Sequence, residues 1–153
     1  MGFDIFWLAF KDGKPLSYPR RLIEDIFGLT PTEEKRAGNV REYSDGSVLE
    51  IYSLEAPEES SLMICRPPAA LEFWDALFAL MRKTSSMLVI PDQTTKFLVA
   101  SPEVLPHLPP DLKGEIRVVS ATADILAAID GPQERVQAYV RQIVGDATCR
   151  KDP

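Results

Sequence analysis

The chain has 153 residues, of which 45% are hydrophobic and 26% are charged, and it carries a net charge of −6 with a pI of about 4.8. These values are typical of one globular domain with an ordinary core, and they exclude a globally disordered chain. An acidic chain is a poor binder of nucleic acid or of anionic membranes, because phosphate binding requires clustered Lys and Arg. It suits a basic partner instead.

Cysteine and histidine are scarce, with two of the first and one of the second. That number is too small for a disulfide framework or a zinc site. The opening run MGFDIFWLAF lacks the basic segment of a secretory signal, and no apolar run reaches membrane-spanning length. We therefore expect a cytoplasmic protein with no metal and no cofactor.

The first half of the chain predicts a strand, a helix and then three more strands. Residues 3–10 are apolar at both alternating sets of positions, which is typical of a strand buried on two sides. Pro19 and Gly28 bracket a helix with one apolar stripe. An Asp-Gly pair at 45–46 between two β-type runs predicts a hairpin, and the run 61–66 adds a third strand to an antiparallel meander.

The second half opens with LEFWDALFALMRK (71–83), a predicted helix whose broad apolar face should pack flat on a sheet. Two strands, a proline-limited helical turn, a strand and a helix are then predicted at 85–92, 95–101, 102–112, 115–120 and 121–129. Ser120 or Thr122 is expected to cap the last of these helices. After Gly131 we expect an amphipathic helix and a loose tail at 146–153.

These elements together predict a single α+β domain over residues 1–145. Strands come in a run and then alternate with helices, which favours a mostly antiparallel sheet of about five to seven strands with helices packed mainly on one face. The sheet is mixed if MLVI (87–90) and IRVV (116–119) pair in parallel, and the crossover-length segment between them permits such pairing.

Three residues are candidates for catalysis: His107, Cys65 and Asp4. His107 lies among prolines with Glu103 and Asp111 four residues to either side, so a carboxylate-assisted general base is one interpretation. No G-x-S-x-G elbow and no Gly-rich phosphate loop occur in the sequence. We therefore favour a surface histidine, an inert core cysteine and a strand-end aspartate, and we predict no enzymatic activity.

Arg20 and Arg21 begin the first predicted helix, where positive charge opposes the helix macrodipole. Ion pairing with Glu24 or Asp25 is the interpretation that we favour. A pocket for an anionic ligand is the other, and a small-molecule binding domain is therefore the alternative function.

Carboxylates are denser around the predicted hairpin than elsewhere, which indicates either a solvated face or an acidic surface for a basic partner. In the helix 71–83, two aromatic residues lie at the border of the apolar face, where such residues complete the core more often than they anchor an interface. The candidate partner-binding residues are Glu42, Asp45, Glu55, Glu58, Glu59, Trp74 and Phe78.

Four segments together resemble a known class of proteins. They are the opening MGFDIF, a Pro-Arg pair at 19–20 before a helix, a Trp-Asp pair within 71–80, and VVSATADILAAI at 118–129. This outline is similar to a set of small acidic bacterial proteins that resemble immunity proteins of polymorphic-toxin or type VI secretion systems. Such proteins bind and neutralise a cognate toxin. The resemblance implies a non-enzymatic inhibitor that covers the active site of a basic toxin domain.

Overall fold

The computed structural model describes residues 4–31, 38–52, 54, 56–91 and 95–129. Its main sheet contains β1 (Asp4–Lys11), β2 (Lys14–Pro15), β4 (Thr30–Pro31), β5 (Gly38–Glu42), β6 (Val48–Tyr52), β8 (Ser61–Cys65), β9 (Ser86–Ile90), β10 (Lys96–Val99) and β11 (Glu115–Val118). A separate pair joins β3 (Tyr18–Pro19) to β7 (Glu58–Glu59). The helices are α1 (Arg20–Phe27), α2 (Leu71–Lys83), α3 (Thr122–Ala128) and the 3-10 helix η1 (Pro102–His107).

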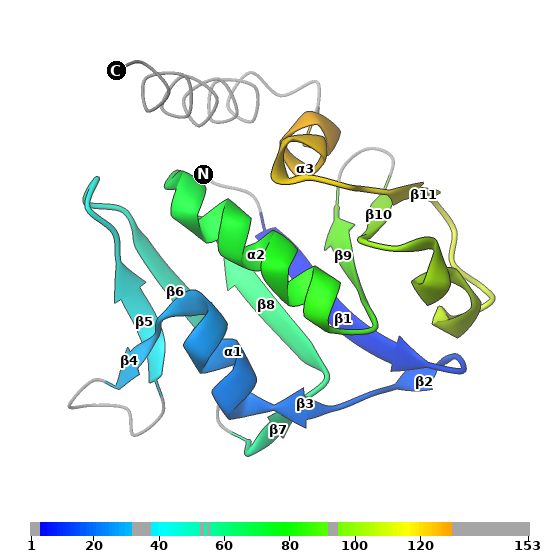
Figure 1. The fold of residues 1–153 in the computed structure, drawn as a ribbon, viewed down its shortest axis with the longest axis horizontal. Helices are drawn as coiled ribbons and strands as arrows, with labels where there is room; N and C mark the ends of the chain where they lie inside the picture. The colour runs from blue at the N-terminus through cyan, green and yellow to red at the C-terminus, as the bar shows by residue number, and fades with distance from the viewer. Residues whose placement is uncertain (1–3, 32–37, 53, 55, 92–94, 130–153) are drawn as a thin grey trace.

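The nine strands of the main sheet follow the order β11-β10-β9-β1-β8-β6-β5-β4, with β2 paired to β1 (Figure 1). All pairings are antiparallel except that of β10 with β11, so the predicted α+β class is confirmed. Two of the nine strands, β2 and β4, are only two residues long. A strand of two residues is too short to show a period-2 pattern in the sequence, which is why the sequence predicts only about five to seven strands.

The predicted meander is present as the neighbouring strands β5, β6 and β8. Its first turn is closed by the Tyr43 amide, which donates to the Ser47 carbonyl at 2.9 Å, and Gly46 adopts a φ of +87° there. The Asp45 Oδ1 atom accepts a hydrogen bond from the Ser47 amide at 2.9 Å. The Asp-Gly pair forms the turn as the sequence predicts, because glycine tolerates positive φ and the aspartate side chain accepts a hydrogen bond from the backbone of its own turn.

The parallel pair exists, but its members differ from those expected. β11 pairs with β10, and β9 lies between β10 and β1 with antiparallel partners on both sides. The connection from β9 to β10 is short, so β10 folds back beside β9 before the crossover through η1 begins. MLVI and IRVV are consequently separated by one strand.

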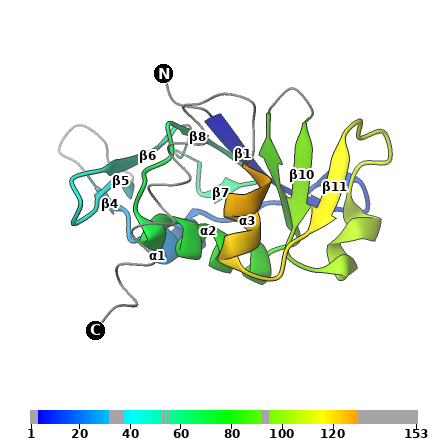
Figure 2. The ribbon, with the colours of Figure 1, turned by 90° about the horizontal axis from the view of Figure 1, so that it is seen from above.

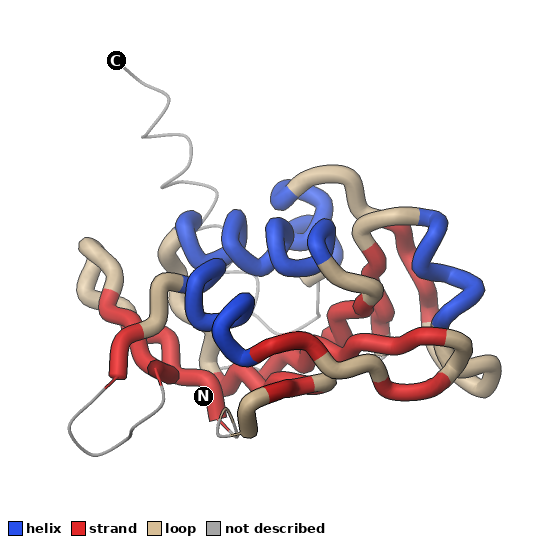
Figure 3. Tube along the Cα trace, turned by 60° about the horizontal axis from the view of Figure 1, so that its bottom comes forward, coloured by secondary structure: helices blue, strands red, loops and turns tan. Residues whose placement is uncertain are grey.

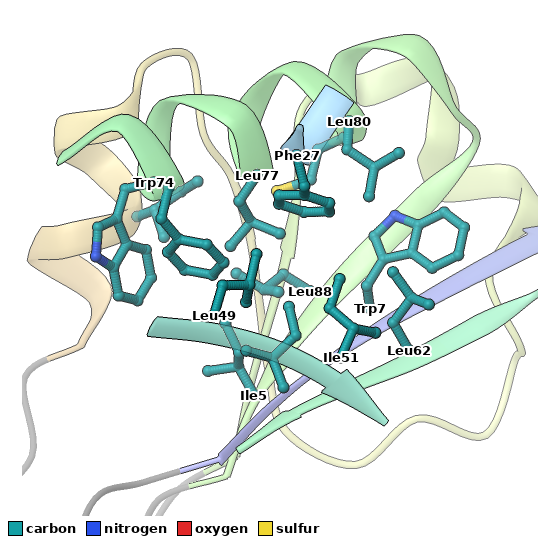
Figure 4. Close-up of a cluster of buried hydrophobic side chains, with 14 of the residues drawn as sticks. Ile5, Trp7, Phe27, Leu49, Ile51, Leu62, Trp74, Leu77, Leu80 and Leu88 are labelled. Carbon is teal, nitrogen blue, oxygen red and sulfur yellow. The ribbon is translucent and has the colours of Figure 1, made fainter. Parts of the chain in front are cut away.

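Three helices form a layer on one face of this sheet, as Figure 1 and Figure 3 show. α2 lies across the strands and buries Phe73, Trp74, Leu77, Leu80 and Met81. These side chains meet strand residues such as Ile5, Trp7 and Leu49, which are fully buried (Figure 4). The predicted broad apolar face of α2 is thus confirmed as a core-facing surface.

The helix ends show one prediction that holds and one that fails. Gly28 ends α1 in the left-handed conformation with φ +66°, and a Cβ there would lie 2.7 Å from Nη1 of Arg41. At α3, however, neither Ser120 nor Thr122 is the cap residue. The Asp124 Oδ2 atom accepts from the Ser120 amide at 2.9 Å, and the Thr122 hydroxyl donates to Asp75 of α2 at 2.8 Å. The Ser120 hydroxyl also donates to Asp124 Oδ2, at 3.1 Å, so the acceptor comes from inside the helix and neither hydroxyl caps it.

η1 packs on the opposite face of the sheet, at one end only. Its Val104 joins Leu108, Met87, Phe97 and Val99 in a second, smaller cluster of buried side chains. β1 runs between the two clusters: Ile5, Trp7 and Ala9 face the helix layer at 0–1% exposure, and the alternate residues are half-buried. The predicted two-sided burial of this strand is therefore complete on one side only.

Within the described residues, no helix is both long and apolar enough to cross a membrane. The predicted helix after Gly131 and the tail at 146–153 lie outside those residues, as does the end of the predicted 1–145 domain.

Candidate functional site: the sheet side opposite the helix layer

One side of strands β1, β5, β6 and β8 is turned away from the helix layer. Cross-strand pairs such as Phe6 with Met63 and Glu42 with Val48 fix which residues share that side, since side chains alternate along a strand. We name this surface the open face. Its members are Asp4, Phe6, Leu8, Val40, Glu42, Val48, Glu50, Ser61, Met63 and Cys65.

Large apolar side chains are exposed mainly on this side of the sheet. Val48 and Met63 are 50% and 36% exposed, and Ile116 and Val118 of β11, on the same side, are 43% and 46% exposed. Between these two exposed pairs, Phe6 and Leu8 of β1 are half-buried, and Met87, Phe97 and Val99 of β9 and β10 are buried beneath η1. Met63 lies opposite Tyr52, four residues along β6 from Val48, so the two exposed residues share a side of the sheet without being direct neighbours. That shared side makes the surface a candidate interaction site.

The strand positions of the open face carry charges of one sign, while the guanidinium of Arg66, which follows β8, lies close enough to the Cys65 thiol to oppose the rise of its pKa. Asp4, Glu42 and Glu50 contribute carboxylates, and no strand position that defines this face carries Lys or Arg. A surface that carries exposed apolar residues among carboxylates is complementary to a partner whose contact region is apolar and basic.

Cys65 lies on the open face opposite Asp4, and not in the core as expected. Burial, followed by the charge of Asp4 and a hydrogen bond with it, raises the pKa of the Cys65 thiol. The thiol is therefore protonated at neutral pH, which makes it a weak nucleophile. Asp4 itself is exposed at the strand end, where we expected it.

The carboxylates proposed from the sequence do not form one surface. Glu42 lies on the open face and Asp45 lies in the turn at one end of β6, where its carboxylate also accepts from the Ser47 hydroxyl. Glu58 and Glu59 lie in β7, which follows the other end of β6 and pairs with β3. The Glu59 Oε1 atom accepts from the Ala56 amide at 3.1 Å, and Glu55 lies outside the described residues.

The expectation that Trp74 belongs to a partner-binding surface is wrong for this fold. Its side chain is fully buried, and its indole Nε1 donates to the carbonyl of Pro68 at 3.1 Å. Phe78 is half-buried in the helix layer, with the guanidinium of Arg82 5.9 Å from its ring centroid. Neither aromatic residue lies on the same side of the sheet as Glu42, because α2 covers the other side.

Arg20 and Arg21 form the ion pairs that we favoured, at 3.3 Å to Glu24 and 4.0 Å to Asp25. They border a hollow of about 450 Å³ that Pro19, Leu29 and Pro57 also line. Because the two carboxylates belong to the same lining, its charge is balanced, and the hollow offers an anion little net attraction.

His107 serves the turn between β1 and β2. Its Nδ1 atom accepts from the Asp12 amide at 3.2 Å, its carbonyl accepts from the Gly13 amide at 2.9 Å, and an Asp12 carboxylate oxygen lies 3.4 Å from Nδ1. The carboxylate beside the histidine is thus Asp12, which is distant in sequence and was not indicated by the spacing of Glu103 and Asp111. The arrangement attaches η1 to the turn.

Among the described residues, no group of three or more His, Cys, Asp and Glu side chains is placed to hold a metal ion. Comparison of the chain with protein-family models, with curated proteins and with solved structures found no match.

Sequence reasoning missed Val48, Glu50 and Met63 as members of a common surface. A signal was present, because VLEIY and SLMIC alternate between core residues and these three positions. Period-2 alternation separates two sides of a strand, but the side that helices cover depends on tertiary packing.

Proposed function

We propose that this chain is a non-enzymatic protein-binding inhibitor of the immunity type, which uses its open face to cover a basic toxin domain. One observation carries the proposal: exposed Val48 and Met63 lie on the same side of the sheet as the carboxylates of Glu42 and Glu50. A cytoplasmic location belongs to the proposal, with neither nucleic acid nor a membrane as partner.

Strand residues suit this role because their backbone is already ordered. β6 and β8 pair with each other and, through β8, with the central strand β1, so little conformational entropy is lost when a partner docks. Desolvation of the apolar residues supplies affinity, and the carboxylates accelerate encounter with a basic surface and oppose acidic partners. Inhibition would be steric, which requires no reactive group on the chain.

The test begins with the products of the genes adjacent to this one, each expressed to look for growth arrest and for rescue by co-expression of this chain. The open-face variant combines Glu42→Lys with Glu50→Lys, and the matched control combines Glu103→Lys with Asp111→Lys, which changes the net charge equally at another place. We expect the open-face variant to slow association about tenfold and to weaken its salt dependence, with the control close to wild type.

Equal effects of the two double variants would show that the open face is not the contact surface. A neighbouring protein that neither binds this chain nor arrests growth would contradict the inhibitor function itself.

A small-molecule binding domain is the second candidate: the hollow of about 450 Å³ beside Arg20 and Arg21 has room for a ligand, although its balanced charge gives an anion little net attraction. A panel of anionic metabolites should then raise the melting temperature of the wild type and not that of Arg21→Ala. Arg21 suits this comparison because its side chain is 90% exposed and its removal leaves the core intact.

A further inference from the structure

β11 forms one edge of the main sheet, and among the described strands it pairs only with β10. Figure 2 shows it as the last strand at its end of the sheet. The opposite edge strand, β4, is two residues long and contains Pro31, which offers no amide hydrogen for pairing. The two edges therefore differ in their capacity to accept another strand.

The hydrogen bonds to β10 show which backbone groups of β11 point outward. The Glu115 amide donates to the Thr95 carbonyl at 3.1 Å, and the Val119 amide donates to the Val99 carbonyl at 2.8 Å. Because backbone groups alternate along a strand, the amides and carbonyls of Ile116 and Val118 point away from β10. A further strand would bind at those two residues.

The side chains of β11 are divided between the two sides of the sheet. Glu115 and Arg117 lie on the side of the helix layer and form an ion pair of 2.9 Å, and Ile116 and Val118 lie on the other side. The strand thus presents one acidic and one basic residue two positions apart, with an apolar residue between them.

We propose that β11 is a self-association edge, at which two copies of the chain pair antiparallel. The two-fold axis passes between Ile116 of one copy and Ile116 of the other. Ile116 of each copy then exchanges both backbone hydrogen bonds with Ile116 of the other. In this register Glu115 of one copy lies directly opposite Arg117 of the other, twice per dimer. These are non-hydrogen-bonded pairs, in which side chains approach most closely.

Charge selects this register over its neighbours. A shift by two residues in one direction places Arg117 opposite its own counterpart, and a shift in the other direction does the same to Glu115. Like charges directly opposite each other destabilise a strand pair. In the selected register, Val118 lies opposite Gly114, which has no side chain to obstruct it. The edge is therefore self-complementary in charge and in shape.

A two-fold axis perpendicular to the sheet keeps the open faces of both copies on the same side. The contact is short, so we expect a dissociation constant on the order of 100 μM. This inference does not depend on the proposed function, because it concerns an edge and not the open face.

The experiment is sedimentation equilibrium of the full chain from 10 μM to 1 mM. The wild-type mass should rise from 17.1 kDa toward twice that value. Glu115→Arg and Arg117→Glu should each weaken association about tenfold, because both cross-strand pairs become repulsive. Mixing the two single variants in equal amounts, or combining both changes in one chain, should restore it, since opposite charges then face each other again.

Ile116→Pro provides an independent variant, because it removes an amide that points outward and leaves the bonds from β11 to β10 intact. It should abolish dimerisation with an unchanged circular dichroism spectrum. A wild type that stays at 17.1 kDa up to 1 mM overturns the proposal. A dimer that both single charge variants retain at wild-type strength overturns it as well, because another surface would then be responsible.

Discussion

The two sides of the central sheet contain similar residues in different surroundings. On the helix side, Trp7 and Leu62 are 0% and 2% exposed, whereas Met63, which follows Leu62, is 36% exposed on the other side. Neighbouring residues of one strand thus differ in burial only because α2 covers one side. The comparison teaches that the apolar residues of β8 stabilise the fold on the side under α2, whereas Met63 on the other side lies beyond the cluster under η1 and remains exposed.

The first test of this comparison replaces Trp74, the largest buried side chain of α2. Trp74→Ala should lower the free energy of unfolding by about 3 to 5 kcal/mol, since it leaves a cavity against Phe73 and removes the bond to Pro68. Urea unfolding measures this value. A loss below about 1 kcal/mol would show that the helix layer packs more loosely than described.

A second test concerns Arg41, which joins β5 to the helix layer. Its Nη1 donates to the Phe27 carbonyl at 3.0 Å and its Nη2 donates to Glu72 at 3.1 Å. Arg41→Ala should cost about 1 to 2 kcal/mol in urea unfolding, a range lowered for partial exposure. Arg41→Lys should recover part of the loss, because an ammonium keeps the charge but not the two-pronged geometry. Equal losses of stability in Arg41→Ala and Arg41→Lys would contradict the assignment of the two hydrogen bonds to the guanidinium.

The helix side also predicts a pH dependence at Tyr43. Burial raises the pKa of Tyr43 from 10.0 to about 12. The hydroxyl ionises in the unfolded chain first, so its contribution to stability is full below pH 10 and is lost as the pH rises toward 12. Between pH 9 and pH 11, wild type should lose about 1.4 kcal/mol more than Tyr43→Phe does. Identical losses in the two proteins would show that Tyr43 ionises normally.

The smallest effect is expected on the open face. Met63→Ala should change the free energy of unfolding by less than about 0.5 kcal/mol, because the side chain is exposed and leaves no cavity. The same substitution at Met81, which is 1% exposed under α2, should cost about 2 to 5 kcal/mol. Similar values for the two methionines would remove the distinction between the two sides.

Much of the fold could be predicted from the sequence because local signals agreed with tertiary packing. The run 71–83 is a helix with the expected bounds, and the Asp-Gly turn and its meander formed as predicted. The parallel pairing was assigned to the wrong strand, because strand order depends on contacts between distant residues. The periodicity of apolar residues along the chain does not encode those contacts.

The residues of the candidate site were harder to predict from the sequence. Glu42 and Glu58 are close in the sequence, yet β6 separates their positions and only Glu42 lies on the open face. Trp74 lies at the border of a helical wheel, where its burial depends on Pro68 and α3 nearby and not on α2 alone. Carboxylates that are close together along the chain need not be close together on one surface, because each strand divides its residues between two sides.

Methionine oxidation tests the central claim, that the open face is the surface that binds a protein partner. Met63 is 36% exposed, whereas Met81 and Met87 are 1% and 2% exposed and serve as internal references. In the free chain, peroxide should oxidise Met63 well before the other two. In the complex with a protein partner found by the growth-arrest test, Met63 should be protected at least several-fold with the references unchanged. An equal rate of Met63 oxidation in the free chain and in a saturated complex would contradict the account.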